Sequence, residues 1–295
     1  MKTKLIYNLG RRGFFSEINN MILAKIYANK YHFDFIVNSY YWNCRYKNGL
    51  HDYFENEIQE QNNLFSAQIT RNRFRFTYKI NNLHTLFYNI NYIRNVAYLI
   101  FHRNVLLGSE IYNEMRSDIF LKNVDPDDFI KEIQKCLRIK PSIRHEFDLI
   151  FNHLKIGGPF LGVHIRRGDK ITTGEMNDIS LDRYAEEIIA TSYKSIYLAT
   201  DDIMCVNYLK EKMELKGIHV YYNPSLSRKG FSEGLFNHTS RRKRYEETLI
   251  LLLDIYVLSK ASFFIGTYSS NLSRVIPCLL GFNNCKSLDT NWHIG

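Results

Sequence analysis

The chain of 295 residues lacks several features that mark specialised classes of protein. Its five cysteines are odd in number, widely spaced and without a C-x-x-C pair, so neither a disulfide framework nor a zinc knuckle is predicted. No apolar run approaches the roughly 18 residues of a membrane helix. The longest such run, at 248–258, is interrupted by Asp254, and the N-terminus has no signal-peptide core. These absences predict a cytoplasmic protein with no membrane span.

Internal repeats and low-complexity linkers are also missing, so the overall size and charge set the first expectations. A hydrophobic content of 45% is enough for a large core, and at ~100–200 residues per domain the length suggests two domains. The net charge of +9 favours an anionic partner, which could be nucleic acid, a phospholipid surface or a phosphorylated small molecule. Charge alone does not choose among them.

The first forty residues show a strand, helix, strand alternation. Residues 3–9 have a strand pattern and are followed by the glycine-bearing loop GRRGFFS. A helix is predicted next, with Ser16 as its N-cap, and then a strand at 33–37. This order predicts a βαβ unit at the start of the chain.

Residues 50–155 are mostly helical in pattern, with one clear helix start. Asp125 is placed to cap a helix, Pro126 to occupy its first position, and Asp127 and Asp128 to favour the helix dipole. The same letters also fit a metal-binding D-x-D motif.

The second half alternates more strongly between strands and helices. Strands are predicted at 160–165, 195–199, 219–222 and 262–266, and helices at 181–193, 203–216, 244–259 and 269–280. The Gly-Gly-Pro punctuation near 155–160 suggests a boundary between an N-terminal domain, 1–155, and a doubly wound C-terminal domain, 156–295.

Polar loops follow three of these strands. Residues 166–170 read Arg-Arg-Gly-Asp-Lys, residues 200–202 read Thr-Asp-Asp, and residues 267–271 read Thr-Tyr-Ser-Ser-Asn. Because ligands of open parallel sheets bind beyond the carboxyl ends of the strands, the three loops predict one pocket for an anion and a polyol together.

The residue types in these loops suit a nucleotide diphosphate. Arginine offers a planar fork for phosphate oxygens, and Lys170 adds a point charge. A helix start at Ser269, Ser270 and Asn271 supplies hydroxyl, amide and N–H donors, so no metal is required. Ribose hydroxyls or a guanine edge could donate hydrogen bonds to a further set of carboxylates, namely Asp201, Asp202 and Asp254.

Each of these positions has a plainer alternative. The Arg166–Arg167 pair could be an exposed, salt-bridged loop, and Asp201 could cap the helix that starts at 203. Asp254 lies on a buried helix face, where a carboxylate needs a partner. The basic run at 241–244 could be a nucleic-acid patch, but a solvated loop or pocket rim before the long helix fits it better.

Three separated blocks, in order, resemble the GDP-fucose-dependent α1,6-fucosyltransferases, the family of the animal core and bacterial nodulation enzymes. The blocks are GVHIRRGDK, YLATDD and LDIYVLSKASFFIGTYSSNLSRV. The opening GFFSEINNMILAKIYANKYHFDFIV and the closing KSLD at 286–289 also resemble that catalytic domain, whereas 50–155 match weakly.

The resemblance implies a GT-B-type α/β fold, with two Rossmann-like domains facing across a cleft. It implies GDP-fucose as donor, inversion at the sugar and no metal or other cofactor. Arg166 would grip the β-phosphate, His164 and Asp254 would lie against guanine, and Lys170 would sit between phosphate and base. The remaining predicted substrate contacts or supports are Gly13, Phe14, Ser16, Arg167, Asp169, Asp201, Asp202, Tyr268, Ser269, Ser270 and Asn271.

The general base and the acceptor are less closely fixed by the resemblance. The family places a glutamate shortly after the lysine, which here gives Glu175, with Asp178 as an alternative. Gly168 matches the R-R-G-D of α1,2-fucosyltransferases instead. The expected reaction is α1,6 transfer to the GlcNAc of a glycan. Transfer with α1,2 or α1,3 linkage, a lectin-like protein without turnover and a basic nucleic-acid-binding protein remain as alternatives.

Overall fold

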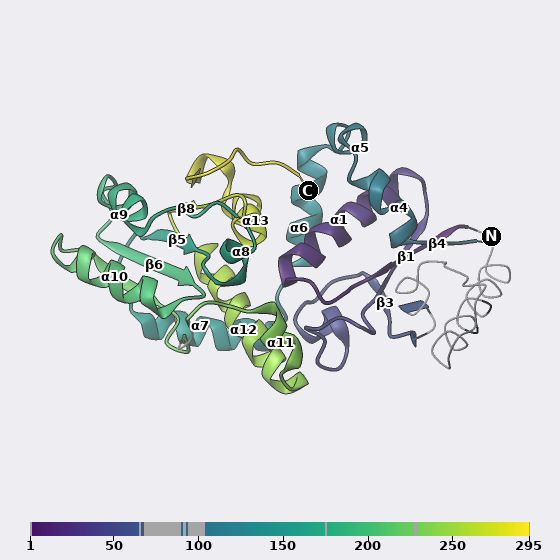
Figure 1. Cartoon of the computed structure of the whole chain (residues 1–295), viewed down its shortest axis with the longest axis horizontal. Helices are drawn as coiled ribbons and strands as arrows, with labels where there is room; N and C mark the ends of the chain where they lie inside the picture. Colours follow the sequence, from purple (N-terminus) through teal and green to yellow (C-terminus); the bar gives the residue numbers. More distant parts are fainter. Residues whose placement is uncertain are drawn as a thin grey trace.

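Two parallel β-sheets, each covered by helices, make up the protein (Figure 1). The computed structural model describes residues 2–64, 66–67, 90, 93, 104–174, 176–226 and 229–294. The predicted two-sheet α/β class is confirmed.

The first sheet has the strand order β3-β2-β1-β4, and all its strands are parallel. Its strands are β1 (Lys4–Asn8), β2 (Asp34–Asn38), β3 (Gln59–Gln61) and β4 (Val105–Leu107). Helix α1 (Phe14–Lys30) joins β1 to β2, which confirms the predicted βαβ start. The short strands β3 and β4 were not predicted, because three residues are too few to show an alternating pattern.

Short helices connect this sheet to the second half of the chain. They are α4 (Gly108–Met115), α5 (Asp118–Lys122), α6 (Pro126–Cys136) and α7 (Pro141–Leu154), whereas η1 (Gly49–Asp52) lies between β2 and β3. Helix α6 starts as predicted, because Asp125 Oδ1 accepts a hydrogen bond from the backbone N–H of Asp127 at 2.9 Å. The helical prediction for most of 68–103 lies outside the described residues.

The second sheet has the order β7-β6-β5-β8-β9 and is also fully parallel. Its strands are β5 (Leu161–Ile165), β6 (Ser195–Thr200), β7 (His219–Tyr222), β8 (Phe263–Gly266) and β9 (Cys285–Ser287). The helices that follow are α8 (Gly168–Thr172), α9 (Leu181–Ile189), α10 (Ile203–Glu214), α11 (Glu233–His238), α12 (Arg241–Leu258), α13 (Asn271–Leu280) and η2 (Phe282–Asn284). The four predicted strands and four predicted helices are present, whereas α8, α11 and β9 were not predicted.

The predicted N-cap of the first helix at Ser16 is wrong. Gly13 occupies that position, and its carbonyl accepts the first helical hydrogen bond from Glu17 N at 3.1 Å. The Glu17 side chain turns back and accepts a hydrogen bond from Gly10 N at 3.0 Å. This contact closes the glycine loop over the helix start, so α1 begins at Phe14.

The predicted loop at 241–244 is also wrong. Ser240 Oγ accepts a hydrogen bond from Lys243 N at 3.2 Å, so the basic run forms the first turn of α12. With Ser240 as N-cap the helix begins at Arg241, three residues before the expected start at 244.

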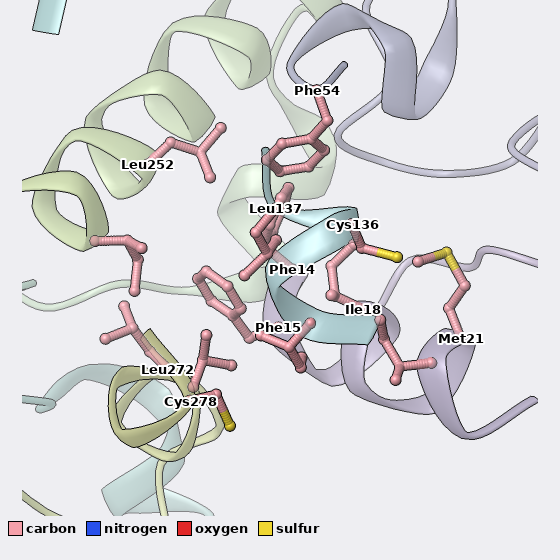
Figure 2. Packing of buried hydrophobic residues seen from close by; sticks show 14 of the residues in the cluster. Phe14, Phe15, Ile18, Met21, Phe54, Cys136, Leu137, Leu252, Leu272 and Cys278 are labelled. Carbon is pink, nitrogen blue, oxygen red and sulfur yellow. The ribbon is translucent and has the colours of Figure 1, made fainter. Parts of the chain in front are cut away.

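A single hydrophobic cluster joins helices that flank both sheets. Figure 2 shows Ile18 of α1 beside Cys136 of α6, in the same cluster as Phe14 of α1, Leu252 of α12 and Leu272 of α13. The start of α1 is therefore fixed by apolar packing against helices of the second half. The domain boundary at 155 remains a prediction.

Both sheets reverse their strand order beside their first strand. The chain runs from β5 outward to β6 and β7, and returns to place β8 and β9 on the other side of β5. Loops leaving β5 and β8 therefore diverge, which opens a crevice at the carboxyl edge. In the first sheet the same reversal lies between β1 and β4.

Candidate functional site

A cavity of about 670 Å³ lies at the carboxyl edge of the second sheet and extends to the loop before α1. It brings together most of the residues that the sequence singled out. The predicted residues that line it are Gly13, Phe14, Ser16, His164, Arg166, Lys170, Asp201, Asp254, Ser269, Ser270 and Asn271. The three loops and the N-terminal loop thus share one cavity.

Four predicted residues do not line the cavity: Arg167, Asp169, Asp202 and Tyr268. Two of them contact residues that do, since Asp169 pairs with Arg166 and the backbone N–H of Arg167 donates to Asp201. Glu175, the predicted base, lies outside the described residues.

Arg166 leaves the end of β5 and is held on three sides. Its Nη1 lies 2.8 Å from Asp201 Oδ2 and its Nη2 lies 3.0 Å from Asp169 Oδ1. The guanidinium carbon is 5.0 Å from the centre of the Phe231 ring. Such a clamp fixes the guanidinium in one orientation, which reduces the entropy lost when it binds an anion.

Asp201 organises the loop around Arg166. Besides Arg166, its carboxylate accepts hydrogen bonds from the backbone N–H groups of Arg167 at 2.7 Å and Phe231 at 3.1 Å. The alternative that Asp201 caps the next helix is wrong, because Asp202 Oδ1 accepts from Met204 N at 2.9 Å and caps α10.

Packing explains the glycine in R-R-G-D. Gly168 has a positive φ of +36°, and a Cβ there would lie 2.4 Å from Phe231 O and 2.7 Å from Asp201 Oδ2. A side chain would therefore push the Phe231 segment away from the arginine loop. The packing of this loop by itself requires glycine at position 168, so Gly168 carries no information about the sugar linkage.

Arg167 points away from the cavity. It forms an ion pair with Asp178 and donates to the Ile179 carbonyl at 3.1 Å. Its side chain and that of Arg166 are each only 18% exposed, so the two arginines are salt-bridged but not on an exposed loop.

His164 is a neutral, buried side chain on β5. Its Nδ1 lies 2.7 Å from Ser273 Oγ of α13. Burial, followed by the positive charge of Arg166, lowers the pKa of His164 to about 3. At neutral pH the imidazole thus offers one donor and one acceptor without adding charge.

Asp254 of α12 has the partner that its burial requires. The hydroxyl of Tyr197 on β6 donates to Asp254 Oδ1 at 2.7 Å. Burial, then the negative charge of Asp254, raises the pKa of Tyr197 well above its ordinary value, which keeps the phenol a donor. The expectation of a partnered buried carboxylate is confirmed.

The start of α13 forms the remaining wall. Ser270 stands at the N-cap position, and Asn271 is the first helical residue, two positions after the predicted start at 269. Tyr268 is buried outside the cavity, where its backbone N–H donates to Asp289 Oδ1 at 2.7 Å. Asp289 Oδ2 also accepts from Ser269 N at 3.2 Å, so the Asp289 carboxylate fixes the loop from behind.

Sequence reasoning missed several other residues of the cavity wall. They include Arg12, Asn43, Phe231, Glu233, Glu247 and Arg274. Arg274 lies one turn after the predicted helix start and Arg12 beside the predicted glycine, so adjacency alone could have indicated both. Burial, followed by the charge of Arg116, lowers the pKa of Arg274 to about 10.

Asn43 joins the two halves at one end of the cavity. Its Nδ2 donates to Arg11 O at 2.9 Å and to Asn237 Oδ1 at 3.0 Å, while its carbonyl accepts from Arg244 Nε at 2.7 Å. We call this set of contacts the Asn43 latch. It holds the glycine loop of the first half against α11 and α12.

The described residues were also compared with the requirements of a metal site and of a membrane-spanning helix. Those residues contain no group of three or more His, Cys, Asp or Glu placed to hold a metal ion. Their helices include none with the length and apolar character needed to cross a bilayer.

Two parallel sheets with a cavity between loops of both halves correspond to the GT-B architecture. NodZ, an α-1,6-fucosyltransferase from Bradyrhizobium crystallised with GDP, matches with a TM-score of 0.58 and 14% identity over 95% of this chain and 93% of that chain. POFUT1 in complex with GDP-fucose matches with a TM-score of 0.59 and 10% identity, over 98% of each chain. At such identities the likeness establishes the fold alone.

The family follows from a separate comparison. The family model of the alpha-(1,6)-fucosyltransferase N- and catalytic domains matches residues 128–281, more than half of the chain. The chain belongs to this family and is a fucosyltransferase.

Proposed function

We propose that the protein transfers L-fucose from GDP-β-L-fucose to a glycan hydroxyl, forming an α1,6 linkage to GlcNAc with inversion at the anomeric carbon. One observation carries the proposal: Arg166 and Lys170, Ser270 and Asn271, and His164 and Asp254 line a single cavity although three separate loops and helices supply them. Family membership supports fucose as the transferred sugar.

The cavity wall suggests how the donor is held. Arg166 grips the β-phosphate, and Lys170 lies between phosphate and base. Ser270 and Asn271 donate to the diphosphate from the start of α13, where the helix dipole favours negative charge. Neutral His164 and the carboxylate of Asp254 contact guanine, whose N–H edge donates to carboxylates. Residues 156–295 thus form the donor domain, and residues 1–155 the acceptor side.

In the transfer step the acceptor oxygen forms a bond to the anomeric carbon as the bond from that carbon to the phosphate oxygen breaks. The bonding electrons pass to the β-phosphate of GDP, where the positive charges of Arg166 and Lys170 stabilise them without a metal. The acceptor proton goes to a carboxylate, for which we propose Glu175. Asp178, the alternative base, is engaged with Arg167 in the structure.

A stability measurement with GDP tests the donor site. GDP should raise the melting temperature in the presence of EDTA, because a ligand that binds only the folded state stabilises it. Arg166→Ala should abolish the shift, whereas Arg242→Ala, which alters an exposed arginine paired with Glu246, should retain it. A shift that requires added magnesium or manganese contradicts metal-free binding.

Transfer to an acceptor panel tests the rest of the proposal. GDP-fucose is incubated with glycans ending in GlcNAc or galactose, and the products are characterised by mass and linkage. A 6-linked fucose on GlcNAc is the expected product. A 2- or 3-linked fucose on either sugar supports the alternative linkages instead.

A further inference from the structure

Four carboxylates line the cavity within the described residues: Asp201, Glu233, Glu247 and Asp254. Asp201 is committed to Arg166 and two backbone N–H groups, and Asp254 to Tyr197. Glu233 differs from these in its position, since it stands where the arginine cluster and the N-terminal loop approach each other. No motif in the sequence pointed to it.

The segment 231–233 is fixed to the same two carboxylates that fix Arg166. The Glu233 N–H donates to Asp169 Oδ2 at 2.7 Å, while Asp169 Oδ1 lies 3.0 Å from Arg166 Nη2. Two residues earlier, Phe231 donates its N–H to Asp201 and places its ring against the Arg166 guanidinium. The start of α11 and Arg166 therefore keep a constant relative position.

On its other side Glu233 approaches the N-terminal half. Burial raises the pKa of the Glu17 carboxyl, and the negative charge of Glu233 raises it further. Burial likewise raises the pKa of the Cys44 thiol to about 12, and Glu233 again contributes in the same direction. Cys44 lines the cavity and Glu17 holds the glycine loop. Glu233 thus lines the same cavity as the phosphate-binding arginine and the facing loop residues Arg12 and Gly13.

A sugar attached to a phosphate at Arg166 would project into this space. We propose that the Glu233 carboxylate accepts hydrogen bonds from hydroxyl groups of the donor sugar and so sets its orientation for transfer. This inference rests on the proposed function, because it places the diphosphate at Arg166. A carboxylate has two acceptor oxygens, which suits neighbouring hydroxyls, and its negative charge stabilises a sugar carbon that becomes positive as the bond to phosphate breaks.

Separate measurements of GDP and GDP-fucose test this role. In Glu233→Gln the side chain keeps its size but loses its charge and one acceptor oxygen. Its affinity for GDP, measured by calorimetry, should stay close to that of the wild type. Its affinity for GDP-fucose and its kcat/KM for GDP release from GDP-fucose should fall about ten- to hundredfold together. Release by hydrolysis needs no acceptor, so the test does not depend on acceptor identity.

Glu246→Gln is the matched control, since it makes the same chemical change at an exposed residue of the neighbouring helix. It should behave as the wild type. Glu233→Asp, which keeps the charge on a shorter side chain, should recover part of the lost kcat/KM, and normal GDP binding shows that each variant is folded.

Unchanged GDP-fucose affinity and turnover in Glu233→Gln would overturn the inference. So would an equal loss of affinity for GDP and GDP-fucose, because it would assign Glu233 to the nucleotide. If the wild type binds no GDP, the proposed donor site itself fails, and the two failures are thereby distinguished.

Discussion

The two sheets share a strand order but differ in the chemistry at their carboxyl edges. In the first sheet Asn38 is fully buried, and its Nδ2 donates to Asn8 Oδ1 at 2.8 Å and to Asn63 O at 2.9 Å. Neutral amides there satisfy one another. In the second sheet the corresponding edge carries Arg166 and Asp201 beside a large cavity. The strand order reverses in both sheets, and the side chains after the strands decide what each edge can bind.

The difference has an energetic side. Desolvating amides costs little once their hydrogen bonds are made, whereas desolvated charges need nearly complete pairing. The second edge meets that requirement with Asp169 and Asp201 around one arginine. It therefore keeps a fixed positive group at a cavity wall, which the amide edge does not offer.

Removing one polar side chain from the carboxyl edge of each sheet should give the largest difference in stability and GDP affinity. Asp201→Ala leaves Arg166 with one carboxylate and two backbone N–H groups without their acceptor, so we expect a loss of about 3–5 kcal/mol in unfolding free energy and no GDP binding. Asn38→Ala should cost about 1–3 kcal/mol and leave GDP affinity unchanged. Urea denaturation and calorimetry measure both. Wild-type GDP affinity in Asp201→Ala would contradict the organising role of Asp201.

A methyl group at Gly168 should have the next largest effect. The added Cβ would meet Phe231 O and Asp201 Oδ2, so Gly168→Ala should cost about 2–3 kcal/mol and weaken GDP binding.

Gly174→Ala is its control. Gly174 has a φ of +72°, but a methyl group added there would meet no other atom within 4 Å, so only backbone strain of about 1 kcal/mol is expected. Urea denaturation of both variants separates the cost of backbone strain from the cost of the steric clash at Gly168. Equal losses of unfolding free energy in the two variants would show that the clash with Phe231 is unimportant.

The pH dependence of stability should show the smallest effect. The pKa of His164 is about 3 when folded and near its ordinary 6.5 when unfolded, so the unfolded state binds the proton first as the pH falls. This residue should cost the wild type about 1 kcal/mol between pH 7 and pH 5.5. His164→Gln, which cannot titrate, should lose that much less over the same range. Parallel stability curves for the two proteins would contradict a neutral, buried His164.

Local sequence signals account for much of the second sheet and its loops. Apolar runs of four to six residues identified β5 to β8, and the polar residues directly after β5, β6 and β8 indicated where the cavity lies. The need of a buried carboxylate for a partner anticipated the contact between Asp254 and Tyr197. These inferences depend on neighbours in sequence or on a single buried residue.

What could not be predicted depends on distant contacts. Asp169 and Glu233 are 64 positions apart in the chain, and the bond between them sets both the start of α11 and the place of Glu233. Ser16 failed as a helix cap because Glu17 turns back to Gly10, a competition that the residue types do not decide. Such choices are made by tertiary packing, which overrides local preference.

The Asn43 latch bears on how the protein is produced. Asn237 begins the triplet Asn-His-Thr, at which secretory hosts attach a glycan, and its side chain also donates to Arg11 O at 3.4 Å. A glycan on Asn237 Nδ2 would replace one of its hydrogens, which donate the hydrogen bond between α11 and the glycine loop. Thr239→Ala removes the attachment signal while keeping the backbone carbonyl that accepts from Arg244. The same variant made in a secretory host should therefore keep the hydrogen bonds of Asn237 to Arg11 and Asn43.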